Sequence, residues 1–244
     1  MIKILTALGA VAFIASCLAV GIRLLLLARR TRQLPELLIG LSFLTGGAMA
    51  YILAWAFRYF EVSGTLDVVL GIVGRLVYVS SPVAMSFVAW RVFRPARSWA
   101  GVVVGALLTV NALYVVRPFL IGDLSRHDII FHPLYWITTA GQVLPWAWVA
   151  VESLNLHRML RRRARVGLGE DPALTHRMLL WAVGVGAVAL LSIAVELTAL
   201  AGALGLPHPP MNPIIIVLGT AGAVSLWLAF FPPAAVQRRF ESVG

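Results

Sequence analysis

Long apolar runs separated by short polar segments dominate the chain. A helix needs about 20 mostly apolar residues to cross the hydrocarbon core of a bilayer. Seven stretches meet that requirement, so the pattern predicts an all-α, integral membrane bundle of seven transmembrane helices. They cover residues 4–28, 37–57, 68–93, 99–122, 132–157, 178–204 and 212–233. On this interpretation residues 1–244 form one transmembrane domain, with no soluble domain.

The composition supports a chain that is surrounded mostly by lipid. Of the 244 residues, 60% are hydrophobic and 12% are charged, about half of the ~25% charged residues found in soluble proteins. The net charge of +10 lies in short clusters between the apolar runs, as is typical of cytoplasmic loops. We therefore expect the bilayer and its anionic headgroups, and not nucleic acid, as the partners of these charges.

The basic residues alternate between the two sides of the predicted bundle. Fourteen of the twenty lie in the first, third and fifth loops, with their helix borders, and in the C-terminal tail, whereas Lys3, Arg58 and Arg126 lie on the other side. By the positive-inside rule, this bias places the N-terminus outside and the C-terminus in the cytoplasm. The Arg-, Ala- and Gly-rich composition hints at a bacterial inner (cytoplasmic) membrane.

Ionisable side chains inside the predicted helices are candidates for function, because each costs about 2.5–3.5 kcal/mol in the hydrocarbon. Arg75 and Glu196 fall at similar depths in the outer halves of the third and sixth helices. They could form an ion pair that lines a ligand cavity, or a structural pair that holds the helices in register. The candidate ligand-binding residues are Arg75, Tyr78, Gln142, Trp146 and Glu196.

Arg117 lies near the outer end of the fourth predicted helix. We expect it to reach the outer headgroups, or to pair with Asp123 or Asp128.

A second set of ionisable residues lies toward the cytoplasmic side. Arg23, Arg91 and Glu152 fall within a turn or two of the predicted boundaries. They could pair locally and reach the headgroups, or form an inner ionic cluster that breaks when the bundle changes shape.

The sequence lacks residues and motifs that several classes of cofactor-binding protein and enzyme require. The one lysine, Lys3, is at the N-terminus, so a retinal Schiff base is excluded and no cofactor is expected. The sequence has no His-Glu-x-x-His motif, and it has neither a Gly-x-Gly-x-x-Gly nucleotide-binding pattern nor a nucleophile elbow with a catalytic triad. We therefore predict no catalytic residue, no metal site and no enzyme activity. The Gly101-x-x-x-Gly105 motif predicts close helix packing, within one bundle or in a homodimer.

The closing stretch, residues 227–233 (WLAFFPP) running into Arg238 and Arg239, resembles the exits of bacterial seven-transmembrane sensor modules. The seven-helix plan is similar to that of receptor-type membrane proteins. This resemblance implies signalling, and it carries over no functional residue.

The leading hypothesis is a non-enzymatic, sensor or receptor-like protein that binds a small or lipidic ligand in the outer half of the bundle. It would signal to a separate protein through the basic cytoplasmic loops. The alternatives are a small transporter or lipid-handling protein, and a structural subunit of a membrane complex.

Overall fold

The computed structural model describes residues 2–59, 64–122, 126–168, 172–207 and 211–231. Over these residues the fold is helical, which confirms the all-α part of the predicted fold class. The elements are α1 (Ile2–Thr31), α2 (Leu34–Ser42), η1 (Phe43–Met49), α3 (Ala50–Tyr59), α4 (Thr65–Val88), η2 (Ala89–Phe93), α5 (Ser98–Ile121), α6 (Arg126–Ile129), α7 (Pro133–Arg165), α8 (Pro172–Ala203) and α9 (Met211–Phe230).

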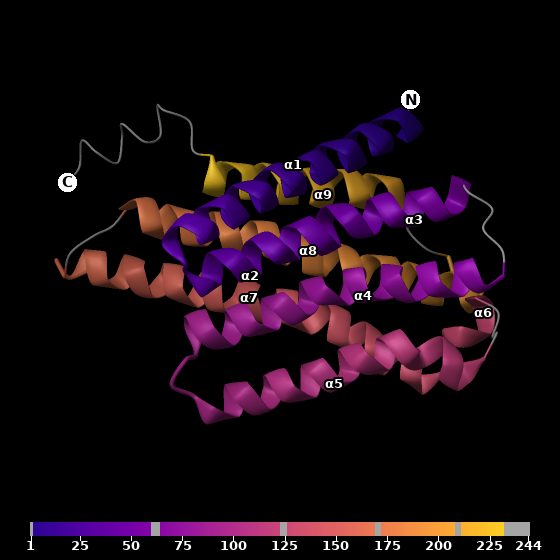
Figure 1. Cartoon of the computed structure of the whole chain (residues 1–244). Coiled ribbons are helices and arrows are strands. Elements are labelled where there is room, and N and C mark those ends of the chain that lie inside the picture. Colours follow the sequence, from indigo (N-terminus) through magenta and orange to yellow (C-terminus); the bar gives the residue numbers. More distant parts are fainter. Residues whose placement is uncertain (1, 60–63, 123–125, 169–171, 208–210, 232–244) are drawn as a thin grey trace.

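Several of these elements join into longer rods. The π-helical segment η1 connects α2 and α3 without a break, and η2 extends α4 in the same way. With α1, α5, α7, α8 and α9, these rods make seven long helical segments in the described part of the chain. They lie roughly side by side, and the start of α1 and the end of α9 are at opposite ends of the bundle (Figure 1).

Six segments of the described chain are long and apolar enough to cross a membrane. They are Val11–Thr31, Leu34–Ala54, Thr65–Phe93, Ser98–Ile121, Pro172–Ala203 and Pro213–Phe230. Large apolar side chains such as Val102, Phe119 and Val217 are more than half exposed on the outside of the bundle. A surface of this kind fits a multi-pass membrane protein, whose helices satisfy their backbone polar groups internally and face lipid.

The long helix outside this group of six is α7. It packs against α4, α5 and α8, so much of its surface faces protein. Its buried residues include the polar Gln142, Glu152 and His157, which lower the hydropathy of the segment. The helix also continues to Arg165 instead of ending at residue 157 as predicted, because the basic residues after 157 add further helical turns.

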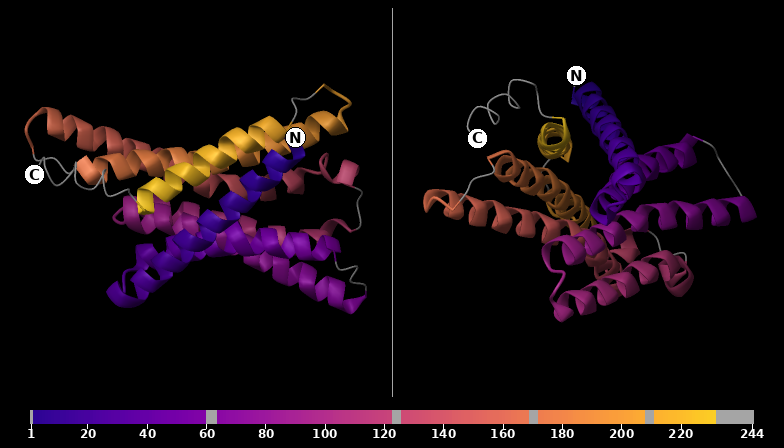
Figure 2. Two further views of the ribbon diagram at one scale, coloured as in Figure 1. Left: turned by 90° about the horizontal axis from the view of Figure 1, so that it is seen from above. Right: turned by 60° about the vertical axis from the view of Figure 1, so that its left-hand side comes forward.

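The rods are arranged in a ring with one helix outside it. α8 lies between α7 and α9, and α1 closes the ring by packing on α9 and on the rod formed by α2 and η1. α4 packs on that rod and on α7. α5 lies at the edge of the bundle against α4 and α7 (Figures 1 and 2).

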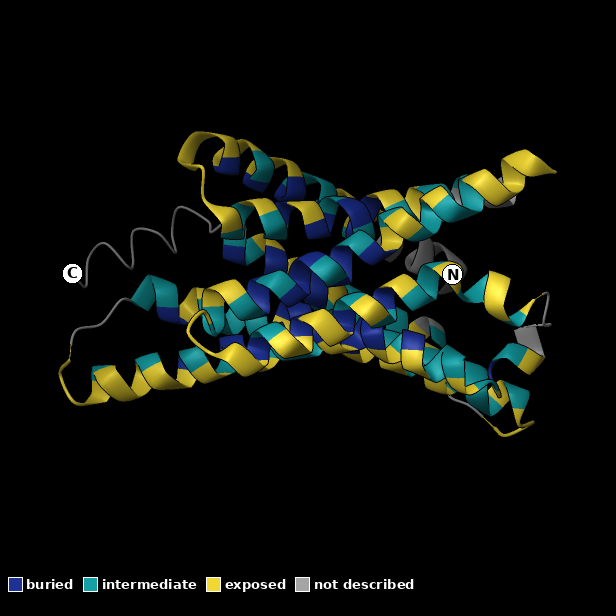
Figure 3. Ribbon diagram, turned by 60° about the horizontal axis from the view of Figure 1, so that its bottom comes forward, coloured by how far each residue is buried: buried dark blue, intermediate teal, exposed yellow. Residues whose placement is uncertain are grey.

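An aromatic cluster fills the centre of the ring. The ring of Phe43 in η1 is 1% exposed and meets the rings of Trp146, Trp181 and Phe230 edge-on, with centroids 6.3, 6.5 and 6.4 Å away. Edge-on pairs of this kind contribute about 0.5–1.5 kcal/mol each beyond their buried area. The buried residues concentrate at mid-length of the bundle, and the exposed ones cover its outside (Figure 3).

Close contacts hold η1 between α1 and α4. A Cβ at Gly47 would lie 2.5 Å from Sγ of Cys17 in α1, and one at Gly46 would overlap Ser81 in α4. The hydroxyls of Ser42 and Ser81 are hydrogen-bonded at 2.8 Å. These contacts fix the position of α4, which forms one side of the cavity described below.

The glycines of the predicted packing motif have different surroundings. A Cβ at Gly101 would lie 3.2 Å from the ring of Trp90 in η2, whereas one at Gly105 would have no heavy atom within 4 Å. Gly101 therefore packs inside the bundle, and Gly105 faces outward.

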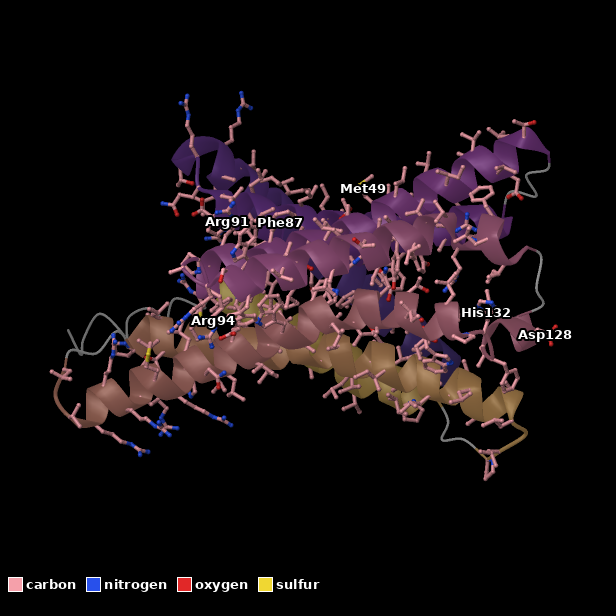
Figure 4. The ribbon with its side chains drawn as sticks, turned by 90° about the horizontal axis from the view of Figure 1, so that it is seen from below. Met49, Phe87, Arg91, Arg94, Asp128 and His132 are labelled. Atoms are coloured by element: carbon pink, nitrogen blue, oxygen red, sulfur yellow. The ribbon has the colours of Figure 1, made fainter. Side chains whose placement is uncertain are left out.

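The two ends of the bundle differ in charge. One end, here called the arginine end, carries most of the described arginines, in helix ends and in the segments between them: Arg29, Arg30, Arg32, Arg94, Arg97, Arg158, Arg161, Arg162, Arg163, Arg165 and Arg177. The other, here called the α6 end, holds α6 and the start of α7. Figure 4 shows Arg91 and Arg94 near the first end and Asp128 and His132 at the second.

Candidate ligand-binding cavity

A cavity of about 860 Å³ lies toward the α6 end, between α4, α5, α7 and α8. α4, α5 and α8 all pack on α7, so α7 forms the wall that they share. The small residues Ala199, Gly202 and Ala203 of α8 leave the space open. The volume falls within the roughly 300–1,000 Å³ that is typical of small-molecule sites.

The walls of the cavity are mixed. Ile129, Ile130, Val143 and Val195 supply apolar surface. The principal polar lining comes from four helices, namely Tyr78 of α4, Tyr114 and Arg117 of α5, Tyr135 and Gln142 of α7, and Glu196 of α8. A mostly apolar pocket with a few converging polar groups is the usual form of a ligand site.

Arg117 is held at the cavity by two kinds of contact. Its Nη1 donates a hydrogen bond to Oγ1 of Thr138 at 2.9 Å. Its guanidinium lies over the rings of Tyr114 and Tyr135, with Cζ 4.9 and 5.1 Å from the centroids, where a cation is stabilised by the negative face of each ring. The Nε of Arg117 is buried and has no acceptor among the described residues.

Glu196 faces the same cavity from α8. Its Oε2 accepts a short hydrogen bond from the hydroxyl of Tyr135. In the described part of the chain, Glu196 forms no ion pair, either with Arg75 or with Arg117. Tyr135 therefore stands between the two charges of the cavity, with its ring under Arg117 and its hydroxyl on Glu196.

Gln142 joins the cavity to a buried amide network. Its Nε2 donates to Oδ1 of Asn111 at 2.8 Å, and Nδ2 of Asn111 donates to the carbonyls of Leu107 and Gly141. A Cβ at Gly141 would lie 2.5 Å from Cγ1 of Val110, so the glycine lets α5 and α7 come close enough for this network. The Oε1 of Gln142 is buried without a donor among the described residues.

A smaller chamber of about 60 Å³ continues toward the aromatic cluster. It shares Tyr78, Gln142 and Ser192 with the large cavity, and it is also lined by Phe43 and Trp146. The shared residues place the two spaces next to each other at mid-bundle.

Four of the five predicted ligand-binding residues line these two spaces. Tyr78, Gln142 and Glu196 line the large cavity, and Trp146 lines the small chamber. Arg75 is not among the residues that line either space. Its Nη1 would lie 3.7 Å from a Cβ at Gly71, on its own helix, so the side chain extends along α4.

Arg117, Tyr114 and Tyr135 are cavity residues that sequence reasoning did not select. Arg117 was expected at the headgroups or on an aspartate, and of those two aspartates Asp123 lies outside the described residues. The structure instead directs the guanidinium at Thr138 and two tyrosine rings. One signal was present in the sequence, because Tyr114 precedes Arg117 by three residues and so shares its helix face.

The second predicted cluster has a different composition from the one expected. Glu152, which is 7% exposed, forms a two-pronged ion pair with Arg94, with Nε to Oε1 at 2.8 Å and Nη2 to Oε2 at 2.9 Å. Arg23 instead lies over the ring of Phe231, and Arg91 over that of Trp90, at 4.4 and 4.1 Å.

Trp148 completes the surroundings of Glu152. Its Nε1 donates to Oε1 of Glu152 at 3.2 Å, and its ring stacks on that of Trp99 with centroids 5.8 Å apart. The hydrogen bond and the negative charge of Glu152 raise the pKa of the Arg94 guanidinium above its usual value, so Arg94 is charged at every physiological pH. The pair ties the loop before α5 to α7.

Among the described residues, no group of three or more His, Cys, Asp or Glu side chains is arranged to hold a metal ion. In comparisons with known proteins, neither a family model nor a curated protein nor a solved structure matches this chain.

Proposed function

We propose that this protein is a membrane sensor of receptor type, which binds a small or lipidic ligand in the cavity between α4, α5, α7 and α8. The observation that carries the proposal is Arg117, whose buried Nε has no acceptor among the described residues although it borders a cavity of ligand size. An unsatisfied charged donor is costly in a low-dielectric site, and a bound acceptor offsets that cost.

The proposed topology has seven spans, with the N-terminus outside and the C-terminus in the cytoplasm of a bacterial cell. Six segments qualify as spans by length and hydropathy, and α7 supplies the seventh as a helix largely enclosed by protein. Most of the described arginines gather at one end, which the positive-inside rule assigns to the cytoplasm. The cavity then lies in the outer half of the membrane.

The path of the signal follows α7. This helix carries Tyr135 and Gln142 at the cavity and Glu152 near the arginine end, and it continues into the basic segment that ends at Arg165. Pro145 lies between these two regions and removes one backbone hydrogen bond. A tilt of α7 at this proline would transmit ligand binding to a separate cytoplasmic protein at the basic segment.

Mass spectrometry of molecules extracted from the purified protein tests the binding site. Ala199→Trp fills the cavity, whereas Leu197→Trp adds the same side chain at a position of α8 that is 56% exposed. We expect wild type and Leu197→Trp to retain a common small molecule, and Ala199→Trp to lose it. Equal retention by all three proteins would remove the cavity from consideration.

A small transporter is the second candidate, and the chamber beside Trp146 favours it because it extends the cavity toward mid-bundle. Flux of the identified molecule across proteoliposomes separates the two functions. A sensor retains its ligand without net transport, whereas a transporter moves the ligand to the other side and loses this flux in Ala199→Trp.

A further inference from the structure

We infer that the ligand is a zwitterionic amphiphile, whose anionic group binds Arg117, whose ammonium group binds Glu196 and whose apolar part lies along the cavity wall. This inference deepens the proposed ligand-binding function and rests on it. The ammonium could belong to a lipid headgroup or to a small soluble molecule, and the experiment below distinguishes these two sources.

The free edge of Arg117 fits an anion. Of the guanidinium nitrogens, Nη1 is used by Thr138, and the group also lies over the rings of Tyr114 and Tyr135. The remaining edge, with Nε and Nη2, has no acceptor among the described residues. Two parallel N–H groups on this edge match the two oxygens of a carboxylate or phosphate, which is the strongest geometry that arginine offers.

The free oxygen of Glu196 fits a cation. Oε2 accepts from Tyr135, while Oε1 has no donor among the described residues. Oε1 of Gln142 is a second, neutral acceptor in the same cavity and is likewise without a donor there. A primary ammonium carries three N–H donors and no acceptor, so it suits a carboxylate oxygen of this kind, and Gln142 offers a further acceptor to other donors of the ligand.

The balance of charge in the cavity favours a ligand that is neutral overall. Arg117 and Glu196 are the charged residues among those that line it, and they do not pair with each other. A ligand with a single charge would satisfy one residue and leave the other unpaired inside the membrane, where an unpaired charge costs several kcal/mol. A zwitterion satisfies both and adds no net charge.

The apolar walls indicate that the ligand has a hydrocarbon part. Ile129, Ile130, Val143 and Val195 line the space beside the charged residues. An alkyl chain along these walls packs against these side chains and adds contacts that the headgroup alone cannot make. We therefore expect the complete amphiphile to bind more tightly than its headgroup.

Binding of a matched set of compounds to the purified full chain in detergent tests the inference. Three carry the same lauroyl chain: lysophosphatidylethanolamine has both charges, lysophosphatidic acid lacks the ammonium, and monolauroylglycerol lacks both. Phosphoethanolamine and L-leucine represent soluble zwitterions. We expect wild type to bind lysophosphatidylethanolamine at least about tenfold more tightly than either lauroyl relative, because tenfold corresponds to about 1.4 kcal/mol, less than one hydrogen bond to a charged group contributes.

Three substitutions locate the two charges. Glu196→Gln should abolish the preference over lysophosphatidic acid, and Arg117→Gln should weaken both phosphate-containing amphiphiles at least about tenfold. Arg23→Gln is the matched control, because Arg23 lies over Phe231 away from the cavity, and it should keep the wild-type order. A soluble zwitterion that binds wild type more tightly than lysophosphatidylethanolamine would identify the soluble source.

The result that overturns the inference is binding that ignores headgroup charge, with equal affinity for the three lauroyl compounds or the same order in Glu196→Gln as in wild type. That outcome leaves the proposed function intact as long as Ala199→Trp still abolishes binding. Loss of the proposed function has a different signature, since binding would then be equal in wild type and Ala199→Trp for every compound.

Discussion

At the scale of single residues, Arg117 has neighbours that no linear pattern indicates. Its hydrogen-bond partner Thr138 and the ring of Tyr135 come from α7, across a helix interface. An arginine near a helix end usually extends to the headgroups. The sequence therefore predicted that position for Arg117. Only the packing of α5 on α7 turns the side chain inward.

Gly141 is the residue at which this packing is most sensitive. A Cβ at this position would lie 2.5 Å from Val110, and a larger side chain would push α5 away and break the contact of Asn111 with the Gly141 carbonyl. For Gly141→Val we expect a loss of about 1–3 kcal/mol, as for other overpacked cores. Such a loss should lower the melting temperature in detergent by about 2–4 °C per kcal/mol.

The matched control for this prediction is Gly105→Val on α5, where a Cβ would meet no heavy atom within 4 Å. It should leave the melting temperature nearly unchanged. If both substitutions have the same effect, the close approach of α5 and α7 at Gly141 is not what stabilises this interface.

At the scale of elements, the apolar runs predicted the positions of the helices well, because length and hydropathy are local properties of the sequence. They failed for the extent of α7, where basic residues after 157 continue the helix. The partner of Glu152 was also not predicted, because the sequence analysis grouped it with Arg23 and Arg91 and not with Arg94. Arg91 and Arg94 both lay near the same boundary, and the π-helical turns of η2 turn Arg91 onto Trp90 and leave Arg94 to reach α7.

The ion pair between Arg94 and Glu152 should behave as a unit. Arg94→Gln leaves the Glu152 carboxylate, 7% exposed, without its cation. Because the Arg94 side chain itself is 38% exposed, solvent screening reduces the loss to about 1–2 kcal/mol. The double variant Arg94→Gln with Glu152→Gln should recover part of this loss, since it removes the buried charge.

Melting temperatures of the two single variants and the double variant form a cycle that measures this coupling. A double variant that melts no higher than Arg94→Gln would mean that the carboxylate is not penalised when its partner is absent.

At the scale of the whole molecule, the two ends of the bundle differ in composition. The arginine end carries most of the described arginines, and the cavity lies toward the α6 end. The alternation of charge along the sequence predicted this segregation, because successive helices run in opposite directions. The full set of residues that line the cavity could not be predicted from the sequence. The walls come from four helices, and the rotation of each helix about its axis depends on packing.

Labelling of single cysteines tests which end faces the cytoplasm. Cys17 is 1% exposed, so it gives little background. Leu168→Cys lies at the arginine end and Leu206→Cys at the α6 end, at positions that are 70% and 53% exposed. In intact spheroplasts, a membrane-impermeant maleimide should label Leu206→Cys and should reach Leu168→Cys only after the membrane is opened. The opposite order would invert the orientation and place the cavity in the inner half.

The wide turns of η1 make the length of this rod as important as its side chains. In a π-helix each hydrogen bond spans one residue more than in an α-helix, and a residue of an α-helix turns the chain by about 100°, since 3.6 residues complete a turn. Deleting one residue between 43 and 49 would therefore convert these turns to α-helix and leave α2 and α3 close to their present relative rotation. Tyr51 could then stay at the ring of Phe13, now 6.2 Å away, while Ser42 stays hydrogen-bonded to Ser81. Inserting one residue would instead rotate α2 relative to α3 by roughly 100°, so an insertion here should be harder to accommodate than a deletion.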